Sequence, residues 1–422
     1  MLESMPEWYL RRKTTAYKLY KQGRTAKYGL DIDLDSYDVD VQSVGRIESL
    51  SDLPADEREV SHSVGVVEDE SLRSATYFQY NKDVVYLQYS RFLREFVSDK
   101  LVAMNLIDAI RRYSWLRKYW FRACPLSLDK YTAFVGSHET AGAFIWVREG
   151  VKIEQPIQAC LFMKGRKMVQ VPHNILIAEP YSSMRVITGC VTHPTCVNSA
   201  HVACTEIYVK RGADVSWTMI HNWGEDLHVR PRMGAVIEEG GILRLNYVLI
   251  SPVKSIQMYP TVISVGREAK ISFRNLLMGL GDSQIDVGSA IIFNGSNTRG
   301  EITTRAIVKD SADIRMRGKL WARKPDVRGH LECRALLLSE KARASAYPTL
   351  QSSVMSAELT HEAAVGKIAE EALFYLMSRG LTEEEATSLL ARGFLDADML
   401  ELPSELTMQI RSIIATTAEK AL

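Results

Sequence analysis

A short pattern recurs along the middle of the chain at a fixed interval. It reads "ADVSW" from residue 213, "GILRL" from residue 241 and "AKISF" from residue 269, so the two intervals are equal and give a 28-residue repeat. Further copies begin at residues 300 ("GEITT"), 312 ("ADIRM") and 342 ("ARASA"). Most copies follow a turn signal such as Lys210-Arg211-Gly212. Short β-prone runs that recur with no helical segment between them predict stacked repeats of strands.

Such a repeat favours a β-solenoid, in which each coil buries its apolar face only by stacking on the next coil. If one 28-residue repeat holds two coils, each coil has about 14 residues, a length that suits a β-helix. A β-sandwich whose turns recur by chance is the alternative. We expect a mainly β protein with a parallel β-helix core.

Changes in the residue types and in the spacing of apolar residues divide the chain into three predicted regions. Residues 1–125 form a mixed region, whose clearest pattern is a helical periodicity between residues 90 and 124. Residues 126–355 form the β-helix core, with short runs of Val, Ile, Tyr and Thr between turn residues. Residues 356–422 form a small helical domain, because apolar residues there return to a spacing of three and four.

The C-terminal domain has recognisable helix boundaries. A first helix is predicted to open at His361 and to stop at Gly380, a residue typical of helix C-termini. A second helix starts with a capping box formed by Thr382 and Glu385. A third is expected over about residues 405–419.

Composition and missing motifs exclude several classes of function. The 52 Lys and Arg residues balance 51 Asp and Glu residues, so no net field favours nucleic acid or an anionic membrane. The charged N-terminus does not resemble a signal peptide, no stretch is long and apolar enough to span a bilayer, and we expect a cytoplasmic protein. The sequence contains no G-x-x-x-x-G-K-[ST], G-x-S-x-G, H-E-x-x-H or C-x-x-C. We therefore expect neither an enzyme with its own nucleotide site nor a nucleic-acid or membrane partner.

The stretch "TGCVTHPTCVNSAHVACTEIYV" gathers three cysteines and two histidines. Half of the repeat separates Cys190 from Cys204, so a 14-residue coil would place them on one line of successive coils, about 4.8 Å apart in backbone. Thiolates hold iron–sulfur clusters, so both are candidate ligands, with Cys196 in the intervening turn as a mobile third. The alternative is that Cys190 and Cys204 are small buried hydrophobic residues. His193 and His201 are expected to be turn and surface residues.

Longer segments carry a family resemblance. "ELTHEAAVGKIAEEALFYLMSRGLTEEEATSLLARGFL" resembles the C-terminal signature of the SufB/SufD iron–sulfur assembly proteins. "VKRGADVSWTMIHNW" and "GAFIWVREGVKIEQPIQA" resemble two further segments of that family, so the resemblance covers about residues 130–395. It implies a right-handed parallel β-helix flanked by an N-terminal region and a C-terminal helical domain. It also implies a scaffold for a transient iron–sulfur cluster, expected as [4Fe-4S], that is later handed to apo-protein acceptors.

The resemblance implies partners and site residues as well. In that family an ABC-type ATPase, SufC, docks on the C-terminal helices and carries the nucleotide site, and a separate donor supplies sulfur. Cys333 matches the B-type cysteine that receives sulfur or holds the cluster. His361 and Glu362 match the last two residues of the B-type triplet "EHE", whereas Thr360 replaces its first glutamate. The N-terminal C-x-x-C-x-x-x-C of many B proteins is missing, and the chain is short for a bacterial B protein. Retention of Cys333, His361 and Glu362 nevertheless favours a compact B-like chain that pairs with itself or with a close paralogue.

Two hypotheses follow for the function. The first is a scaffold that holds its own cluster, either on Cys190, Cys196 and Cys204 or on Cys333 with His361 and Glu362. In the first of these sites, Glu362 or His361 would be the fourth ligand. The rival hypothesis is a D-like structural subunit that completes a dimer and recruits the ATPase without holding iron. Thiolates together with one weaker nitrogen or oxygen ligand favour the scaffold, because the weaker ligand leaves first when a cluster is passed on.

Overall fold

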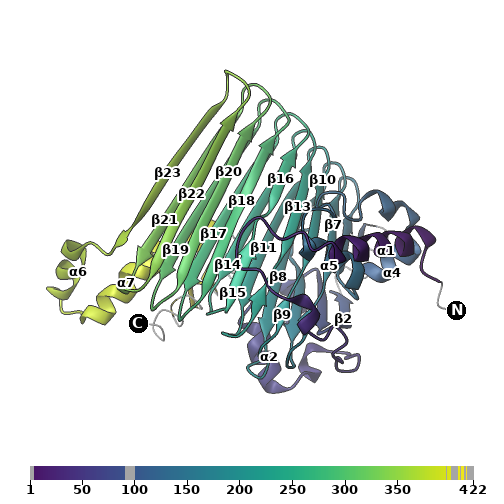
Figure 1. The fold of residues 1–422 in the computed structure, drawn as a ribbon, viewed down its shortest axis with the longest axis horizontal. Helices are drawn as coiled ribbons and strands as arrows, with labels where there is room; N and C mark the ends of the chain where they lie inside the picture. Colours follow the sequence, from purple (N-terminus) through teal and green to yellow (C-terminus); the bar gives the residue numbers. More distant parts are fainter. Residues whose placement is uncertain are drawn as a thin grey trace.

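The computed structural model of the chain describes residues 4–90, 100–395, 397–400, 407–408, 410–412 and 415. Within these residues the strands form two long sheets that advance side by side along the chain, as in a parallel β-helix (Figure 1). One sheet has ten strands and the other has thirteen. The predicted fold class, a mainly β chain with a parallel β-helix core, is confirmed.

The ten-stranded sheet runs from the N-terminal region to the last strand of the described residues. Its members are β1 (Ala75–Tyr80), β2 (Asp83–Tyr89), β5 (Ile157–Met163), β8 (Ser183–Thr192), β11 (Asp214–Asn222), β14 (Ile242–Leu249), β17 (Lys270–Gly279), β19 (Arg299–Val308), β21 (Arg328–Leu337) and β23 (Glu358–Lys367). They lie in the order β2-β1-β5-β8-β11-β14-β17-β19-β21-β23. β2 and β1 are antiparallel, and the pairs from β1 to β23 are parallel.

The thirteen-stranded sheet is assembled from shorter strands in the early coils. Its members are β3 (Leu101–Asn105), β4 (Ala143–Val147), β6 (Val169–Gln170), β7 (His173–Ala178), β9 (Ala200–His201), β10 (Cys204–Val209), β12 (His228–Val229), β13 (Arg232–Ile237), β15 (Ser255–Met258), β16 (Thr261–Ser264), β18 (Gln284–Phe293), β20 (Asp313–Ala322) and β22 (Arg343–Ser352). β18 pairs with both β15 and β16, so one long strand replaces two short ones from that coil onward. β3 is antiparallel to β4 and ends the sheet on the N-terminal side.

The sequence repeat corresponds to one coil of the β-helix. Asp214 lies beside Ile242, and Ile242 lies beside Lys270, so each of these coils spans one full 28-residue repeat. Ser183 lies beside Asp214, so the preceding coil is slightly longer. The predicted 14-residue coil is therefore wrong. A coil needs one stretch of strand in each sheet plus the turns between them, so half a repeat leads from one sheet to the other.

One corner of the coil repeats the same backbone turn. Its residues have positive φ angles: Tyr181 (58°), Gly212 (61°), Gly240 (64°), Glu268 (61°) and Asn297 (55°). The corners are hydrogen-bonded to one another, since Gly212 N–H donates to Glu239 O at 2.8 Å. Glycine adopts this left-handed conformation without the steric cost that other residues meet, which explains the turn signals before the repeats.

The main core lies between the two sheets. Because side chains alternate along a strand, Val215 and Trp217 of β11 point inward and stack on Leu243 and Leu245 of β14. Outward-facing residues such as Ile220 belong to a second core on the outer face of the ten-stranded sheet. Strand β11 therefore contributes to packing on both of its faces.

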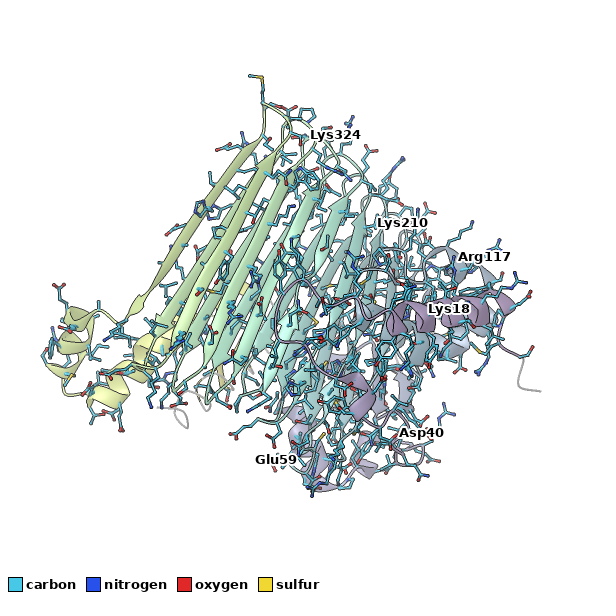
Figure 2. The ribbon with its side chains drawn as sticks, in the orientation of Figure 1. Lys18, Asp40, Glu59, Arg117, Lys210 and Lys324 are labelled. Carbon is cyan, nitrogen blue, oxygen red and sulfur yellow. The ribbon has the colours of Figure 1, made fainter. Side chains whose placement is uncertain are left out.

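The N-terminal region covers the outer faces of the early coils. Its helices are α1 (Glu7–Lys21), α2 (Ala55–His62), α4 (Leu106–Arg112) and α5 (Lys130–His138), with short 3₁₀ turns η1 (Leu34–Ser36), η2 (Leu50–Asp52), η3 (Glu70–Leu72) and η4 (Ser114–Lys118). α1, α4 and α5 lie at the N-terminal end of the β-helix (Figure 1), and Figure 2 marks Lys18 and Arg117 on this region. Helix α1 was not predicted. Of the segment predicted to be helical before residue 125, residues 91–99 lie outside the described residues, and the rest starts with strand β3.

The last coil is left uncovered. Every side chain of β23 except that of Leu359 is exposed, and the side chains of β22 are exposed or half-buried. β23 forms the outer edge of the ribbon in Figure 1, at the opposite end from α1. We call β22 and β23 the open end.

Strand β23 stands where the sequence predicted the start of a helix. Parallel pairing with β21 occupies its backbone, so tertiary structure overrides the helical spacing of the alanines. The helices come later, as α6 (Glu370–Met377), α7 (Glu383–Leu395) and the 3₁₀ turn η5 (Ala397–Leu400). The predicted capping box is confirmed, since Glu385 N–H donates to Thr382 Oγ1 at 3.1 Å and Thr382 N–H donates to Glu385 Oε2 at 2.8 Å. Most of the third predicted helix lies outside the described residues. None of the described helices is long and apolar enough to cross a bilayer.

Candidate functional site

The last two strands of the ten-stranded sheet carry the site residues that the family resemblance implied. β21 and β23 pair in parallel, with Glu332 beside Glu362 and Cys333 beside Ala363. Cys333 belongs to the core between the sheets. Because side chains alternate along a strand, His361 shares the interior face with Cys333 and Ala363, and both glutamates lie on the outer face. The three residues Cys333, His361 and Glu362 therefore do not converge on one point within this chain.

The thiol of Cys333 is closed off from solvent. Its side chain is 0% exposed. Burial raises the pKa of Cys333 to about 12, and the negative charge of Glu332 adds to the effect. At neutral pH such a thiol keeps its proton unless a bound metal favours the thiolate. His361, on the next strand, lies roughly 8 Å away between Cα atoms by strand geometry, and it is exposed at the open end.

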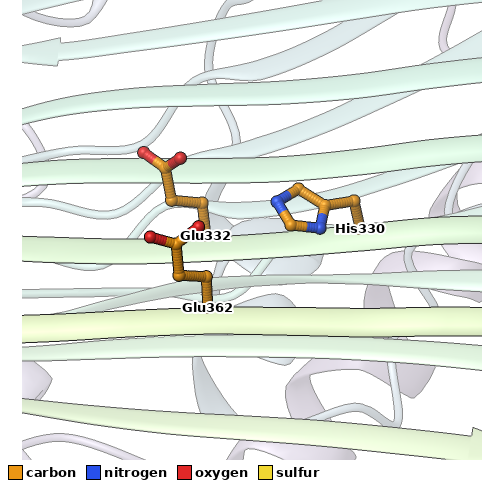
Figure 3. Close-up of side chains that lie close together, drawn as sticks. All are labelled: His330, Glu332 and Glu362. Atoms are coloured by element: carbon orange, nitrogen blue, oxygen red, sulfur yellow. The ribbon is translucent and has the colours of Figure 1, made fainter.

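A second group of possible ligands lies on the outer face. The ligand atoms of His330, Glu332 and Glu362 all lie within 4.8 Å of one another (Figure 3). His330 Nδ1 is 2.9 Å from Thr360 Oγ1, which fixes the imidazole ring against β23. Arg334 Nη2 donates a hydrogen bond to Glu362 Oε1 at 2.8 Å. An imidazole and two carboxylates form a donor set that suits divalent iron, manganese or zinc.

The Glu332 carboxylate is held by charge more than by hydrogen bonds. Its Oε1 atom is buried and accepts no hydrogen bond. It faces two guanidinium groups, with Arg334 Nε at 3.5 Å and Arg305 Nε at 3.6 Å. Arg305 Nη1 also donates to Phe394 O at 3.3 Å, at the end of α7. The outer-face group is thus connected to the C-terminal helices.

His330 and Glu332 were not identified from the sequence. The signal that could have found them is the repeat of coil geometry, since one coil, a 30-residue interval, separates them from Thr360 and Glu362. The sequence predicts these residues as neighbours only if the length of the last coil is known. With the 14-residue coil assumed from the sequence, this 30-residue interval is not recognised as one coil.

Cys190 and Cys204 do not lie on successive coils of one sheet, so the predicted stacking of the two thiols is wrong. Cys190 lies in β8 of the ten-stranded sheet, whereas Cys204 lies in β10 of the thirteen-stranded sheet. Cys190 and Cys196 belong to the core between the sheets, and Cys204 belongs to the core beneath the N-terminal helices. Burial raises the pKa of all three thiols, to about 11 for Cys196. The described residues therefore give Cys190 and Cys204 no common site on stacked coils.

The two histidines of the same stretch are buried, not exposed as predicted. His201 packs against Trp223 with ring centroids 5.0 Å apart. Burial lowers the pKa of His201 to about 3, so the ring is neutral. His193 Nε2 lies 3.0 Å from Asp56 Oδ2 in the N-terminal region. Both serve packing and local hydrogen bonding.

Several polar side chains lie next to Cys190 in the interior of the β-helix. Cys190 is the register neighbour of His221, whose Nδ1 lies 3.0 Å from the Tyr247 hydroxyl. Burial lowers the pKa of His221 and raises that of Tyr247, so both side chains are uncharged. The indole N–H of Trp223 lies beside them without a hydrogen-bond partner. The interior of these coils is therefore neutral but not purely apolar.

The C-terminal helices expose apolar side chains. Phe374 and Tyr375 of α6 are 62% and 59% exposed, and α6 has no buried residue. Helix α7, in contrast, packs Ala391 and Leu395 onto the outer face of the ten-stranded sheet. Among the described residues, α6 therefore presents an apolar surface that the rest of the chain does not cover.

Comparison with known proteins identifies the family. The chain matches the family model described as "SUF system FeS cluster assembly, SufBD core domain" over residues 161–394, more than half of its length. An "Iron-sulfur cluster assembly SufBD family protein" of Methanothermobacter thermautotrophicus is 39% identical over 398 residues, which cover 93% of this chain and 95% of the relative. A protein of the same description from Archaeoglobus fulgidus is 38% identical over 358 residues, covering 85% and 94%.

A bacterial relative shows that the similarity extends beyond archaea. The "Iron-sulfur cluster assembly protein SufB" of Bacillus subtilis is 27% identical over 422 residues, which cover 98% of this chain and 90% of the relative. The resemblance noted in the sequence is thereby confirmed. The chain belongs to the SufBD family of the SUF system and has a role in iron–sulfur cluster assembly.

Proposed function

We propose that the chain is the scaffold on which a new iron–sulfur cluster is assembled, in complex with an ABC-type ATPase that resembles SufC. The observation that carries the proposal is the open end. Cys333 lies buried on β21, whereas His361 and Glu362 lie exposed on β23, and no further coil follows β23 among the described residues. Family membership indicates the class of reaction, and the open end is the part of the fold where we propose that it occurs.

The proposed ligands differ in how tightly they hold iron. A thiolate such as that of Cys333 binds iron–sulfur clusters firmly, whereas an imidazole such as that of His361, on the same face of the sheet, is a weaker ligand for them. A cluster that is only passing through, proposed as [4Fe-4S], benefits from this mixture because the weaker ligand leaves first. Iron binding must displace the proton of the Cys333 thiol, since the pKa of this group is raised by burial.

A dimer would complete the open end. Within the part of the chain that the structure describes, β22 and β23 each present one unpaired backbone edge, which readily accepts a further strand. Exposed apolar side chains lie on or beside them: Tyr347 (46%), Leu350 (36%), Met355 (104%) and Val365 (43%). We propose that a second copy of the chain, or a close paralogue, continues both sheets there. Such pairing brings two copies of Cys333 and His361 to one interface.

The ATPase is proposed to dock on helix α6. Phe374 and Tyr375 are exposed on this helix, and they offer an apolar anchor just after the β-helix. ATP hydrolysis is then a property of the partner, and this chain is not an enzyme. A sulfur donor and apo-protein acceptors complete the proposed set of partners.

A D-like structural subunit remains the second candidate. It is favoured by the state of Cys333, which is fully buried and protonated at neutral pH in the single chain. In that case the chain completes a dimer and recruits the ATPase, while the cluster is held by another subunit.

Anaerobic reconstitution of the full chain with the ATPase, iron and sulfide separates the two candidates. The scaffold predicts visible absorption of a cluster in the wild type and its loss in Cys333→Ser. Cys196→Ser is the matched control, because this thiol is also buried with a raised pKa. Equal cluster content in wild type and Cys333→Ser, with both folded by circular dichroism, would favour the structural subunit.

A further inference from the structure

We propose that His330, Glu332 and Glu362 form a mononuclear site for divalent iron on the outer face of the open end, separate from Cys333. This site deepens the proposed function, because its use as a source of iron for assembly rests on the scaffold proposal. The binding of iron by itself does not rest on it, and it can be measured without sulfide or cluster.

The spacing of the three side chains fits one ion. Bonds from zinc to histidine nitrogen and carboxylate oxygen are about 2.0–2.2 Å long, so two ligand atoms on opposite sides of such an ion are at most about 4.4 Å apart. The ligand atoms of the three side chains already lie within 4.8 Å of one another. Small rotations of the exposed Glu362 are enough to bring them to bonding distance. The register of Glu332 beside Glu362 fixes the two carboxylates on neighbouring strands.

The donor set selects a class of ion. One nitrogen and two carboxylate oxygens suit divalent iron, manganese and zinc, and they are a poor match for copper(I), which prefers sulfur. Thr360 supports the histidine from the second strand. In the tautomer in which Nδ1 donates to Thr360 Oγ1 at 2.9 Å, Nε2 presents its lone pair outward. Thr360 is the residue that departs from the B-type triplet, and this contact gives it a positioning role.

A buried oxygen without a hydrogen bond is the second observation. Glu332 Oε1 is closed off from solvent and accepts no hydrogen bond, although its side chain lies in the group. Ion contacts with Arg334 and Arg305, at 3.5 and 3.6 Å, balance its charge. A buried polar atom in this state is unusual in proteins. A metal ion would satisfy it directly.

In the metal-free chain, the Arg334 side chain occupies the position proposed for the ion. Its guanidinium lies between the two carboxylates, with Nη2 donating to Glu362 Oε1 at 2.8 Å and Nε near Glu332 Oε1. Divalent iron and Arg334 therefore compete for the same oxygens. This competition makes binding reversible, as a cargo ion requires. It also predicts that removal of the Arg334 charge strengthens iron binding.

The fold leaves the proposed iron site open to solvent and separates it from Cys333. Glu362 has a side chain that is 55% exposed, so solvent reaches the site and open coordination positions remain. His330 also lines a surface groove that crosses the outer face of the ten-stranded sheet, together with Arg328, Glu358 and Thr360. Cys333 faces the opposite side of the same strand, so one ion cannot bind both Cys333 and Glu332.

The test is anaerobic titration of the metal-free full chain with Fe²⁺, followed by calorimetry, and with Mn²⁺, followed by electron paramagnetic resonance. We expect one strong site per chain, weakened at least about tenfold in Glu332→Gln and in Glu362→Gln, since each loses a charged ligand. Arg334→Gln should bind more tightly than wild type. Glu358→Gln is the matched control, because Glu358 lies on the same strand and face and forms a comparable ion contact with Arg328.

The outcomes separate the inference from the proposed function. Equal binding in wild type, Glu332→Gln and Glu362→Gln overturns the iron site, and so does an equal loss in Glu358→Gln, which would indicate a general acidic surface. Cys333→Ser is expected to keep the Fe²⁺ and Mn²⁺ signals in full. If Cys333→Ser loses the reconstituted cluster but keeps these signals, both proposals stand. If it keeps both, the scaffold proposal fails while the iron site stands.

Discussion

The first and last coils of this β-helix are finished in different ways. At the start, an antiparallel strand closes each sheet, and the N-terminal helices cover the outer face. At the end, β22 and β23 are parallel edge strands with exposed side chains. Exposed edges of this kind invite unwanted pairing and are normally blocked. The chain completes one end by itself, and we infer that partners complete the other.

Buried charge shows the same contrast. Beneath the N-terminal helices, Glu206 accepts hydrogen bonds from the backbone N–H groups of residues 121–124 at 2.5–3.2 Å. His173 lies between two carboxylates, 3.1 Å from Glu206 and 2.5 Å from Glu139, and all three side chains are fully buried. At the open end, Arg334 and Glu362 form a comparable ion pair in contact with solvent. The first network is shielded from water, whereas the second ion pair is exposed to it.

The largest expected effect tests the C-terminal helices that follow the open end. Removal of residues 368–422 keeps strand β23 but deletes α6 and α7, and it should abolish co-purification with a co-expressed ATPase subunit. Within the full chain, Phe374→Ala combined with Tyr375→Ala should weaken the complex, because these side chains form the proposed anchor. Tyr181→Ala is the control, since Tyr181 is 53% exposed on the β-helix itself. A truncated chain that still co-purifies would show that docking occurs elsewhere.

The next effect tests the N-terminal end of the β-helix, which the chain closes by itself. Glu206→Ala should lower the free energy of unfolding by roughly 3–5 kcal/mol, because it removes one partner of a buried ionic network. Urea denaturation followed by circular dichroism measures the loss. Glu362→Ala, which removes an exposed carboxylate, should leave the urea midpoint close to that of the wild type. Similar losses for both variants would contradict the contrast between the two ends.

The pH dependence of the unfolding free energy tests the same buried network at the N-terminal end. Burial alone lowers the pKa of His173, but the charges and hydrogen bonds of Glu139 and Glu206 outweigh burial and raise it to about 9. The unfolded value is about 6.5, so the stabilisation is fully present below pH 6.5 and is lost as pH rises through 9. The shift corresponds to about 3 kcal/mol. We expect His173→Gln to remove this dependence; a wild-type unfolding free energy that is flat from pH 6.5 to 9.5 would refute the assignment.

The smallest effect concerns the proposed dimer. Val365→Asp places a charge on the interior-facing side of β23, and it should weaken self-association or pairing with a paralogue at least about tenfold, or 1.4 kcal/mol. Val265→Asp is the matched control, because Val265 is 51% exposed away from the open end, compared with 43% for Val365. Light scattering at micromolar concentration, with the ATPase bound, measures the association. An unchanged dimer in Val365→Asp would place the interface elsewhere.

Much of the fold could be predicted from local signals. The repeats that begin at residues 213, 241 and 269 mark β11, β14 and β17 in register. The turn residue Gly212 and the capping box of Thr382 and Glu385 also stand where the sequence indicated. These features depend on neighbours in the chain, so sequence patterns report them directly.

The site depended on long-range geometry that the sequence does not display. Cys190 and Cys204 appeared as a pair because half of a repeat was taken for a whole coil, although it leads to the opposite sheet. Glu362 was expected on a helix, whereas pairing with β21 makes it part of a strand beside Glu332. His330 carries no local signal at all. It becomes a candidate ligand only through the register of the last coil, which sets it beside Thr360.

The most direct test of the account compares the open end with the interior cysteines in one measurement. Mössbauer spectra would be recorded after anaerobic reconstitution with iron-57 and sulfide in the presence of the ATPase. The variants are Cys333→Ser and a triple variant in which Cys190, Cys196 and Cys204 are replaced by serine. We predict that the triple variant, if folded, keeps the cluster spectrum of the wild type and that Cys333→Ser loses it. A cluster that survives in Cys333→Ser and disappears in the folded triple variant would contradict the account.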